Sequence, residues 1–246
     1  MSVLHVNNVS KSYGKHQILW NVQFSAQQGQ IVGLIEPSRS GKTTIIKLIM
    51  GMDYPSAGTV EVLQKQVPNL SLLKQIGYMA QSDALYQDLT GYENLTFFAS
   101  MFLMTKEEQQ ERIAYVVNLV QLESAIKKRV ATYSGGMKRR LSLAVALIQN
   151  PPLLILDEPT VGIDPELRKS IWQELTRLKN EEQKTIIVTT HVMDEAEKCD
   201  DLVMIREGRV ITTGSPQKLK DDYQVTNLEE VFLKAGGEAH AHQSIS

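Results

Sequence analysis

The stretch that decides the fold is Glu36-Pro37-Ser38-Arg39-Ser40-Gly41-Lys42-Thr43-Thr44. The apolar run 31–35 precedes it and the apolar run 45–49 follows it. Strand, tight loop and helix in this order form the context of a phosphate-binding loop. Gly41, Lys42 and Thr43 match the end of the pattern G-x-x-x-x-G-K-[ST], but Glu36 stands where that pattern has its first glycine. An ordinary helix start is the alternative at this point.

A phosphate-binding loop holds its anion with backbone N–H groups and with the N-terminus of the following helix. In such a loop, Lys42 would reach the β- and γ-phosphates of a nucleotide. The Thr43 hydroxyl would be a ligand of Mg²⁺, and Thr44 would bond the α-phosphate. All residues of the stretch 36–44 are therefore candidates for binding a nucleotide.

Two adjacent carboxylates follow a second apolar run. Residues 153–156 are all apolar, and Asp157 and Glu158 come directly after them. Both carboxylates then lie at the C-terminal end of a buried strand, the edge at which open parallel sheets bind ligands. Asp157 would hold Mg²⁺ through water, and Glu158 would polarise the water that attacks a phosphate. The alternative is a solvated strand end, which the phosphate loop upstream disfavours.

A serine and two glycines, Ser134, Gly135 and Gly136, open a further helix that continues as Met137-Lys138-Arg139-Arg140. Small residues at a helix N-terminus make a second anion site. A glycine-containing turn is the plain alternative. One chain has no use for two γ-phosphate sites unless two chains share them.

The periodicity predicts an α/β protein with a mainly parallel sheet, an N-terminal antiparallel β portion and an inserted all-helical subdomain. Together with the motif at 36–44, this pattern indicates a P-loop NTPase core. We expect a single domain over 1–246, with a nucleotide-binding core at 1–87 and 150–220, the helical subdomain at 88–149, and a C-terminal helix and disordered tail at 221–246. The predicted strands are 3–9, 18–24, 31–35, 59–62 (an edge strand), 76–80, 153–156, 185–188, 202–205 and 210–212. The predicted helices are 45–51, 91–104, 106–120, 136–149, 165–182 and a short one after Asn227, with structure lost from Gly236 onward.

The composition excludes several classes of protein. The net charge of −2 at pH 7 argues against a nucleic-acid binder held by a basic field. The single cysteine, Cys199, excludes an internal disulfide and fits a reducing compartment. We expect no signal peptide, and no membrane-spanning segment because no window approaches about 18 uninterrupted apolar residues.

Taken together, these motifs resemble the ATP-binding subunit of an ABC transporter. The matching positions, in order and spacing, are 36–44, Gln81, 133–137, 153–160, 162–164 and His191. The resemblance covers about residues 2–235. It implies a head-to-tail dimer with two ATP molecules at its interface, each between the phosphate loop of one subunit and the serine–glycine segment of the other.

The resemblance also implies roles for residues whose position alone says little. Tyr13 would stack on adenine. Gln81 would contact Mg²⁺ and the attacking water, and couple the site to the helical insertion. Asp164 would organise the dimer interface as well as cap its helix, and His191 would hydrogen-bond the γ-phosphate and orient Glu158. With ATP and Mg²⁺ as cofactors, the catalytic candidates are Lys42, Gln81, Glu158 and His191, and the metal candidates are Thr43, Gln81 and Asp157.

The segment 133–137 corresponds to the signature motif of the family, and Tyr133 and Met137 depart from its commoner form. Together with the ending 227–233, these two residues resemble one branch of the family. That branch serves exporters of drugs, antibiotics, lipids or polysaccharides whose membrane subunit is encoded separately. The partners would then be an integral membrane permease and a second nucleotide-binding subunit, identical or different, with no nucleic acid. The coupling helix of the permease would meet residues 82–103, where the contacts would be Tyr86, Tyr92 and Phe97, unless these are core. The chain would lie at the cytoplasmic face of the cell membrane as a peripheral subunit.

The family has glycine at positions 36 and 39, where this chain has Glu36 and Arg39. A non-glycine residue held in the left-handed conformation costs about 1–2 kcal/mol, and Glu36 would repel a triphosphate unless Arg39 offsets its charge. Two hypotheses follow: an ATPase that powers an exporter, or a hydrolysis-impaired nucleotide-binding partner in a heterodimer. A third hypothesis is a soluble ABC protein that acts in DNA repair or in translation. A DNA-repair protein should have a long heptad insertion, and a translation factor usually has two tandem copies of the domain. Neither feature is seen in this sequence.

Overall fold

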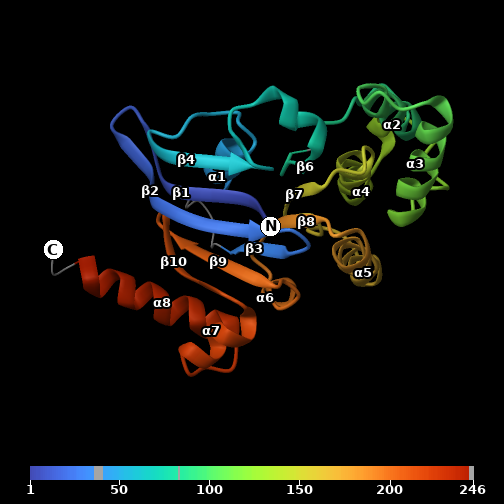
Figure 1. The fold of residues 1–246 in the computed structure, drawn as a ribbon. Coiled ribbons are helices and arrows are strands. Elements are labelled where there is room, and N and C mark those ends of the chain that lie inside the picture. The colour runs from blue at the N-terminus through green and yellow to red at the C-terminus, as the bar shows by residue number, and fades with distance from the viewer. Residues whose placement is uncertain (36–40, 83, 244–246) are drawn as a thin grey trace. The chain divides into compact units, whose positions relative to one another are not determined.

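The structure, a computed structural model, describes residues 1–35, 41–82 and 84–243 of the chain (Figure 1). The contacts divide the chain into two units. Unit 1 combines Met1–Leu72 with Ile187–Ser246, and unit 2 is Leu73–Ile186. The finer subdivision into core, helical subdomain and C-terminal segment stays a prediction.

Unit 1 contains a four-stranded antiparallel sheet, as predicted for the N-terminal part of the chain. Its strand order is β2-β1-β4-β5, and the bounds are β1 Ser2–Tyr13, β2 His16–Gln27, β4 Ala57–Val62 and β5 Lys65–Gln66. The prediction that residues 59–62 form an edge strand is wrong, because β5 pairs with β4 on its outer side. Two exposed polar residues make up β5, so no apolar pattern announces it.

The second group of strands in unit 1 leads into the phosphate loop. Its order is β10-β9-β3-β8, with bounds β3 Ile31–Ile35, β8 Thr185–Thr190, β9 Asp201–Arg206 and β10 Arg209–Gly214. The first two residues of β8 belong to unit 2. Strand β3 runs parallel to β9, and all five of its residues are buried. A strand covered on both faces reads as a continuous apolar run, which is why 31–35 is predicted correctly.

Unit 2 is built on two parallel strands and four helices. The strands are β6, Ile76–Met79, and β7, Leu153–Asp157, and Met79 pairs with Leu156. The helices are α2 Gly91–Ser100, α3 Lys106–Leu119, α4 Gly135–Leu147 and α5 Pro165–Glu182. Helices α2, α3 and α4 contact one another, and α4 also contacts both strands (Figure 1). The mixture of parallel strands, antiparallel sheet and helices agrees with the predicted α/β class.

The helix starts of unit 2 follow the predicted caps. Thr90 and Thr105 both form complete capping boxes, in which the threonine side chain accepts from the third residue of the helix and a glutamate returns the bond. Asp164 caps α5, with proline at the first helical position. The ends are predicted less well: α2 stops at Ser100 instead of continuing to about 104.

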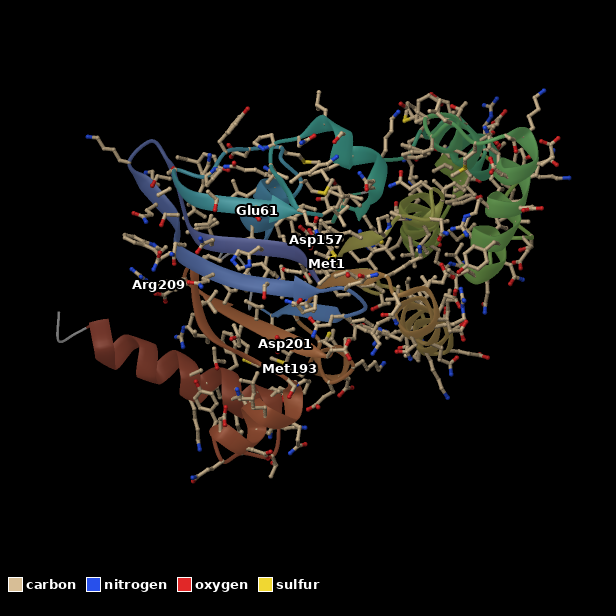
Figure 2. The ribbon with its side chains drawn as sticks, in the orientation of Figure 1. Met1, Glu61, Asp157, Met193, Asp201 and Arg209 are labelled. Carbon is tan, nitrogen blue, oxygen red and sulfur yellow. The ribbon has the colours of Figure 1, made fainter. Side chains whose placement is uncertain are left out.

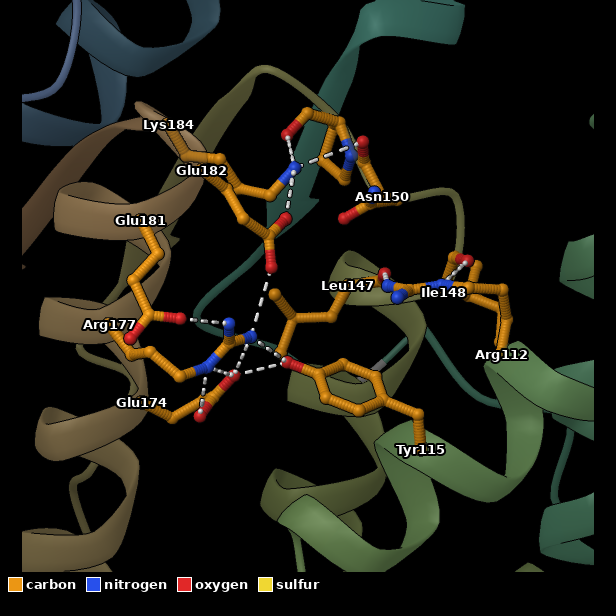
Figure 3. A network of polar contacts seen from close by, with 11 residues as sticks. Arg112, Tyr115, Leu147, Ile148, Asn150, Glu174, Arg177, Glu181, Glu182 and Lys184 are labelled. Carbon is orange, nitrogen blue, oxygen red and sulfur yellow. Dashed lines mark hydrogen bonds and ion pairs between the residues drawn. The ribbon is translucent and has the colours of Figure 1, made fainter.

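A polar network joins α3 to α5 within unit 2 (Figure 3). The Tyr115 hydroxyl of α3 donates to the Glu174 carboxylate of α5. Arg177 Nη2 binds Glu174 at 2.7 Å and the Tyr115 hydroxyl at 3.3 Å. Burial, together with the bond to Glu174, raises the pKa of Tyr115 to about 12. The network therefore links the helical part of unit 2 to α5 through a neutral tyrosine at every physiological pH.

The remaining elements are short helices and the C-terminal helix. Their bounds are α1 Lys42–Ile49, the 3-10 turns η1 Leu70–Gln75 and η2 Val130–Thr132, α6 Met193–Ala196, α7 Pro216–Asp222 and α8 Leu228–Gln243. Helix α7 has no counterpart among the predicted elements. Helix α8 differs from the short helix expected after Asn227, because it continues past Gly236 to Gln243.

Candidate functional site

The start of α1 provides the phosphate-binding half of the site in unit 1. Gly41 is the N-cap, and its φ of 114° lies in the left-handed region that favours glycine. The described residues supply no side-chain cap, and no acidic residue lies in the first turn of α1. Lys42 and Thr44 are half-buried and Thr43 is exposed. Residues 36–40, which include Glu36 and Arg39, lie outside the described residues.

Tyr13, the last residue of β1, is held beside the start of α1. Its hydroxyl donates to Asp53 Oδ2 at 2.6 Å, and Lys11 Nζ donates to Asp53 Oδ1 at 2.6 Å. The bond to Asp53 raises the pKa of Tyr13, and a bond with the Thr44 side chain acts in the opposite direction. The bond from Lys11 lowers the pKa of Asp53 to about 2. The ring is 45% exposed, so a fixed aromatic surface adjoins the residues of the predicted phosphate loop.

His191 follows β8 in unit 1 and is exposed. The turn around it is fixed by the preceding threonine. Thr190 Oγ1 donates to Glu195 Oε2 at 2.8 Å and accepts from the Val192 N–H at 3.0 Å. Glu195 is only 2% exposed, so this anchor is shielded from water. A lone histidine after an apolar strand therefore lies on a well-supported turn.

In unit 2, the two carboxylates lie at the C-terminal end of β7, as predicted. Asp157, labelled in Figure 2, is the last residue of the strand and is buried. Tyr78 on the neighbouring strand β6 has a raised pKa, mainly because it is itself partly buried and further because of the charge of Asp157. Glu158 has a φ of 51°, which is uncommon for a residue with a side chain. The chain therefore turns away from the sheet directly after Asp157.

Arg139 of α4 brings the ends of β6 and β7 together. Its Nη1 donates to the backbone carbonyls of Ala80 and Gln81, both at 2.8 Å. Its Nη2 donates to the carbonyl of Glu158 at 2.7 Å and to that of Asp157. The backbones of three predicted site residues, Gln81, Asp157 and Glu158, are thus bound by one guanidinium within unit 2.

Sequence reasoning missed Arg139, because only the structure shows that this charged residue lies on the buried face of α4. The residues three and four positions later, Ser142 and Leu143, are buried, and residues at these spacings share one face of a helix. Arg139 therefore lies on the buried side of α4. A charged residue on a buried face needs partners, and the sequence neighbours of Arg139 offer no carboxylate.

The serine–glycine segment caps α4. Ser134 is the N-cap, and its Oγ accepts from the Met137 N–H at 3.3 Å. Apart from the neighbouring residues and the helix's own backbone, a Cβ added at Gly135 would meet no described atom within 4 Å, and one added at Gly136 would lie 3.0 Å from the Gly162 carbonyl oxygen. The packing of the described residues therefore does not require glycine at position 135.

The predicted site residue Asp164 and the signature residue Tyr133, both in unit 2, have clear structural roles. Asp164 accepts from the Leu167 N–H at 2.9 Å and so caps α5, while its position stays exposed. The Tyr133 hydroxyl donates to the Ala125 carbonyl at 2.8 Å inside the core. The predicted interface role of Asp164 stays a prediction.

An aromatic group lies on α2 and the segment before it. The rings of Tyr86 and Phe97 meet edge to face, with centroids 4.8 Å apart. Tyr86, Tyr92 and Phe97 are 48%, 42% and 37% exposed. These three side chains are therefore not core residues of unit 2. Across the described ranges of the chain, no helix is both long and apolar enough to cross a membrane.

Comparisons with known proteins agree with these features. Residues 19–161 match the ABC transporter family. The Nod factor export ATP-binding protein I of Rhizobium etli is 39% identical over 248 residues, which cover 100% of this chain and 77% of that protein. ABC transporter G family member 23 of Dictyostelium discoideum is 40% identical over 94% of this chain, which spans only 33% of the length of that protein.

Solved structures share the fold. The structure of an ATP-binding subunit of an ABC transporter matches with a TM-score of 0.88 at 27% identity, over 95% of this chain and 99% of that one. The dimeric ATP-binding cassette MJ0796, in a post-hydrolysis state bound to ADP and Pi, matches with a TM-score of 0.80 at 29% identity, over 86% of this chain and 98% of that one. These likenesses confirm the predicted P-loop fold class. The chain belongs to the ABC transporter family, as one of its ATP-binding domains.

Proposed function

We propose that this chain binds and hydrolyses ATP to power an exporter. The observation that carries the proposal is the group at the ends of β6 and β7, where a buried aspartate, a glutamate and a glutamine follow two paired parallel strands. This edge of a sheet is where open α/β proteins bind their ligands. Export agrees with the names of several relatives, which are Nod factor export proteins.

The residues fit ATP and Mg²⁺. The start of α1 offers helix N–H groups to phosphates without an acidic residue in the first turn. Lys42 would bind the β- and γ-phosphates and Tyr13 would stack on adenine. Mg²⁺ is usually held by one or two protein ligands together with substrate phosphates. Thr43, Gln81 and Asp157 would be the protein groups that hold it here, directly or through water.

The bound nucleotide supplies an activated phosphoryl group for transfer to water. Glu158 would accept hydrogen bonds from that water and polarise it. Gln81 would orient the water, and His191 would hydrogen-bond the γ-phosphate and hold Glu158 in place. The fixed turn around His191 supports this role, because a positioning side chain needs a rigid backbone.

A second copy or a related subunit would complete each site. Ser134, Gly135 and Gly136 would bind the γ-phosphate of the ATP held by the other subunit, and Asp164 would lie in the interface. The open space at Gly135 supports this role. Glycine inside a helix is less favourable than alanine by about 1 kcal/mol, and among the described residues no other element packs where a Cβ at this position would lie.

The remaining partner would be an integral membrane permease. Its coupling helix would contact the exposed aromatic side chains Tyr86, Tyr92 and Phe97. The chain would then lie at the cytoplasmic face of the membrane, and the cargo would be a drug, antibiotic, lipid or polysaccharide. Affinity capture from cells should recover a multi-span membrane protein; recovery of ribosomes instead would favour a translation factor.

The alternative is a subunit that binds nucleotide but hydrolyses it poorly, because Glu36 and Arg39 replace two glycines of the phosphate loop. The deciding experiment measures ATP affinity and turnover for the wild type and for the double variant Glu36→Gly/Arg39→Gly. Equal turnover of the two proteins would exclude the impaired subunit. ATP binding that is absent in the wild type and restored by the glycines would exclude the active ATPase.

A further inference from the structure

We propose that Arg139 is a positioning residue, which holds the chain at Gln81, Asp157 and Glu158 against the helix that begins with the serine–glycine segment. The inference rests on the ATPase function proposed above, because those three residues are its proposed catalytic and metal-binding groups. Arg139 itself would touch neither ATP nor water. It would act through the backbones that it binds.

The contacts of Arg139 are unusual for a buried arginine. The residue is 8% exposed, and its four hydrogen bonds to backbone carbonyls go to two different strand ends. Carbonyls just beyond the end of a parallel ladder have lost their strand partners and must find others when buried. The planar guanidinium, with five N–H donors in a fixed fork, can serve two chains at once. Arg139 therefore fixes the distance between the chain at Gln81 and the chain at Glu158.

Arg139 also ties these strand ends to the start of α4. Arg139 is the fifth residue of α4, and the helix cap Ser134 precedes it by five positions. At 1.5 Å per residue, roughly 7.5 Å of helix separates the two. A helix of this length behaves as a rigid rod, so a displacement of Ser134 by a ligand would move the guanidinium as well. The serine–glycine segment and the strand ends would thus respond together to nucleotide.

The opposite end of α4 offers a matched control. Arg112 of α3 donates to the backbone carbonyls of Leu147 at 2.6 Å and Ile148 at 3.2 Å. It is also a half-buried arginine that binds carbonyls at an end of α4, and it contacts none of the proposed site residues within unit 2. Loss of either arginine should weaken unit 2, but only loss of Arg139 should disturb Gln81, Asp157 and Glu158.

The test compares Arg139→Gln, Arg139→Lys and Arg112→Gln in the full chain by hydrogen–deuterium exchange without nucleotide. Arg139→Gln should accelerate amide exchange at least about tenfold in peptides that contain 80–82 and 157–161. Arg112→Gln should do so only around 147–150. Arg139→Lys keeps the charge but reaches fewer carbonyls, so it should be intermediate, and it replaces Arg139→Gln if the latter does not fold.

The second readout is steady-state hydrolysis of MgATP. Arg139→Gln should lower kcat about tenfold or more while KM stays within about threefold, and Arg112→Gln should keep both near wild type. Unchanged exchange at the two strand ends in Arg139→Gln, or equal losses of kcat in the two arginine variants, would overturn the proposal. If the wild type hydrolyses no ATP, the proposed function fails, and the exchange experiment alone decides whether Arg139 positions the strand ends.

Discussion

Helices α1 and α4 both begin with glycine-containing segments suited to anions, yet the two helix starts are built differently. At α1, Gly41 adopts a left-handed conformation and the described residues supply no side-chain cap. At α4, Ser134 is in an extended conformation, and its hydroxyl caps the helix by accepting from the Met137 N–H. At α4 the N-cap is a serine of the helix itself, whereas at α1 the N-cap is a left-handed glycine, which has no side chain to bond an N–H group.

This difference suggests that the two helix starts bind a nucleotide in different ways. A helix start with a glycine N-cap beside a fixed tyrosine is suited to a nucleotide that the same chain holds, with phosphates near the helix N–H groups. A capped start with open space at Gly135 persists without any ligand. It is suited to a phosphate that another subunit brings. The two starts should therefore respond differently to mutation.

The largest expected effect is on affinity at α1. Lys42→Ala should weaken binding of ATP by the monomer about 10- to 100-fold, because a hydrogen bond to a charged group contributes about 1.5–3 kcal/mol. Isothermal titration calorimetry measures the dissociation constant. The control is Ser134→Ala, which should leave monomer affinity within about twofold. Equal losses in the two variants would show that the distinction between the helix starts is wrong.

Gly135→Ala should change stability and turnover in opposite directions. The free energy of unfolding should rise by up to about 1 kcal/mol, because alanine is the better helix former and its Cβ would clash with no other described element. Turnover should fall about tenfold, because the methyl group would obstruct a ligand that approaches from outside. Urea unfolding and ATPase assays measure the two quantities.

Gly237 provides the matched control for Gly135. It lies within α8, where an added Cβ likewise meets no described atom outside the helix. Gly237→Ala should give a similar gain in stability with unchanged turnover. If Gly135→Ala also leaves turnover unchanged, the start of α4 contacts no nucleotide.

Ser134→Ala should cost about 1 kcal/mol of stability, because the Met137 N–H loses its capping partner. It should also lower turnover. Ser215, which caps α7 by accepting from the Lys218 N–H at 3.4 Å, is the comparison. Ser215→Ala should lose similar stability in thermal unfolding and keep its turnover. Identical activity of the two variants would reduce Ser134 to a structural cap.

The smallest effect concerns the support of Tyr13 beside α1. NMR titration should find the Asp53 carboxyl with a pKa of about 2, and Lys11→Met should raise it toward the ordinary value near 3.9. A lowered pKa means that the charged contact stabilises the native state above the ordinary pKa and is lost as the pH falls through about 2. A wild-type titration midpoint near 4 would show that the contact does not hold Tyr13 in solution.

Local chemistry explains which elements could be predicted. The starts of α2, α3 and α5 follow from Thr90, Thr105 and Asp164, because each cap bonds a residue three positions away. The strands at 31–35 and 153–157 follow from their apolar runs. Such signals need no knowledge of distant contacts.

Distant contacts explain what the prediction missed. The course of α8 past Gly236 is an example. Gly236 lies against the guanidinium of Arg206, the last residue of β9, and the helix continues past it to Gln243. Likewise β5, with only Lys65 and Gln66, exists because β4 offers it a pairing edge. Whether a glycine ends a helix, or whether polar residues form a strand, thus depends on the neighbouring elements.

The residues proposed to bear the chemistry were recognisable in the sequence. Lys42 and Thr43 shortly precede the apolar run 45–49, Asp157 and Glu158 follow the run 153–156, and each motif is contiguous. Their support was not recognisable. Arg139 binds carbonyls 58 and 59 residues before it and 18 and 19 residues after it. Backbone carbonyls belong to every residue type and leave no pattern in the sequence, so folding alone could identify Arg139 as their common partner.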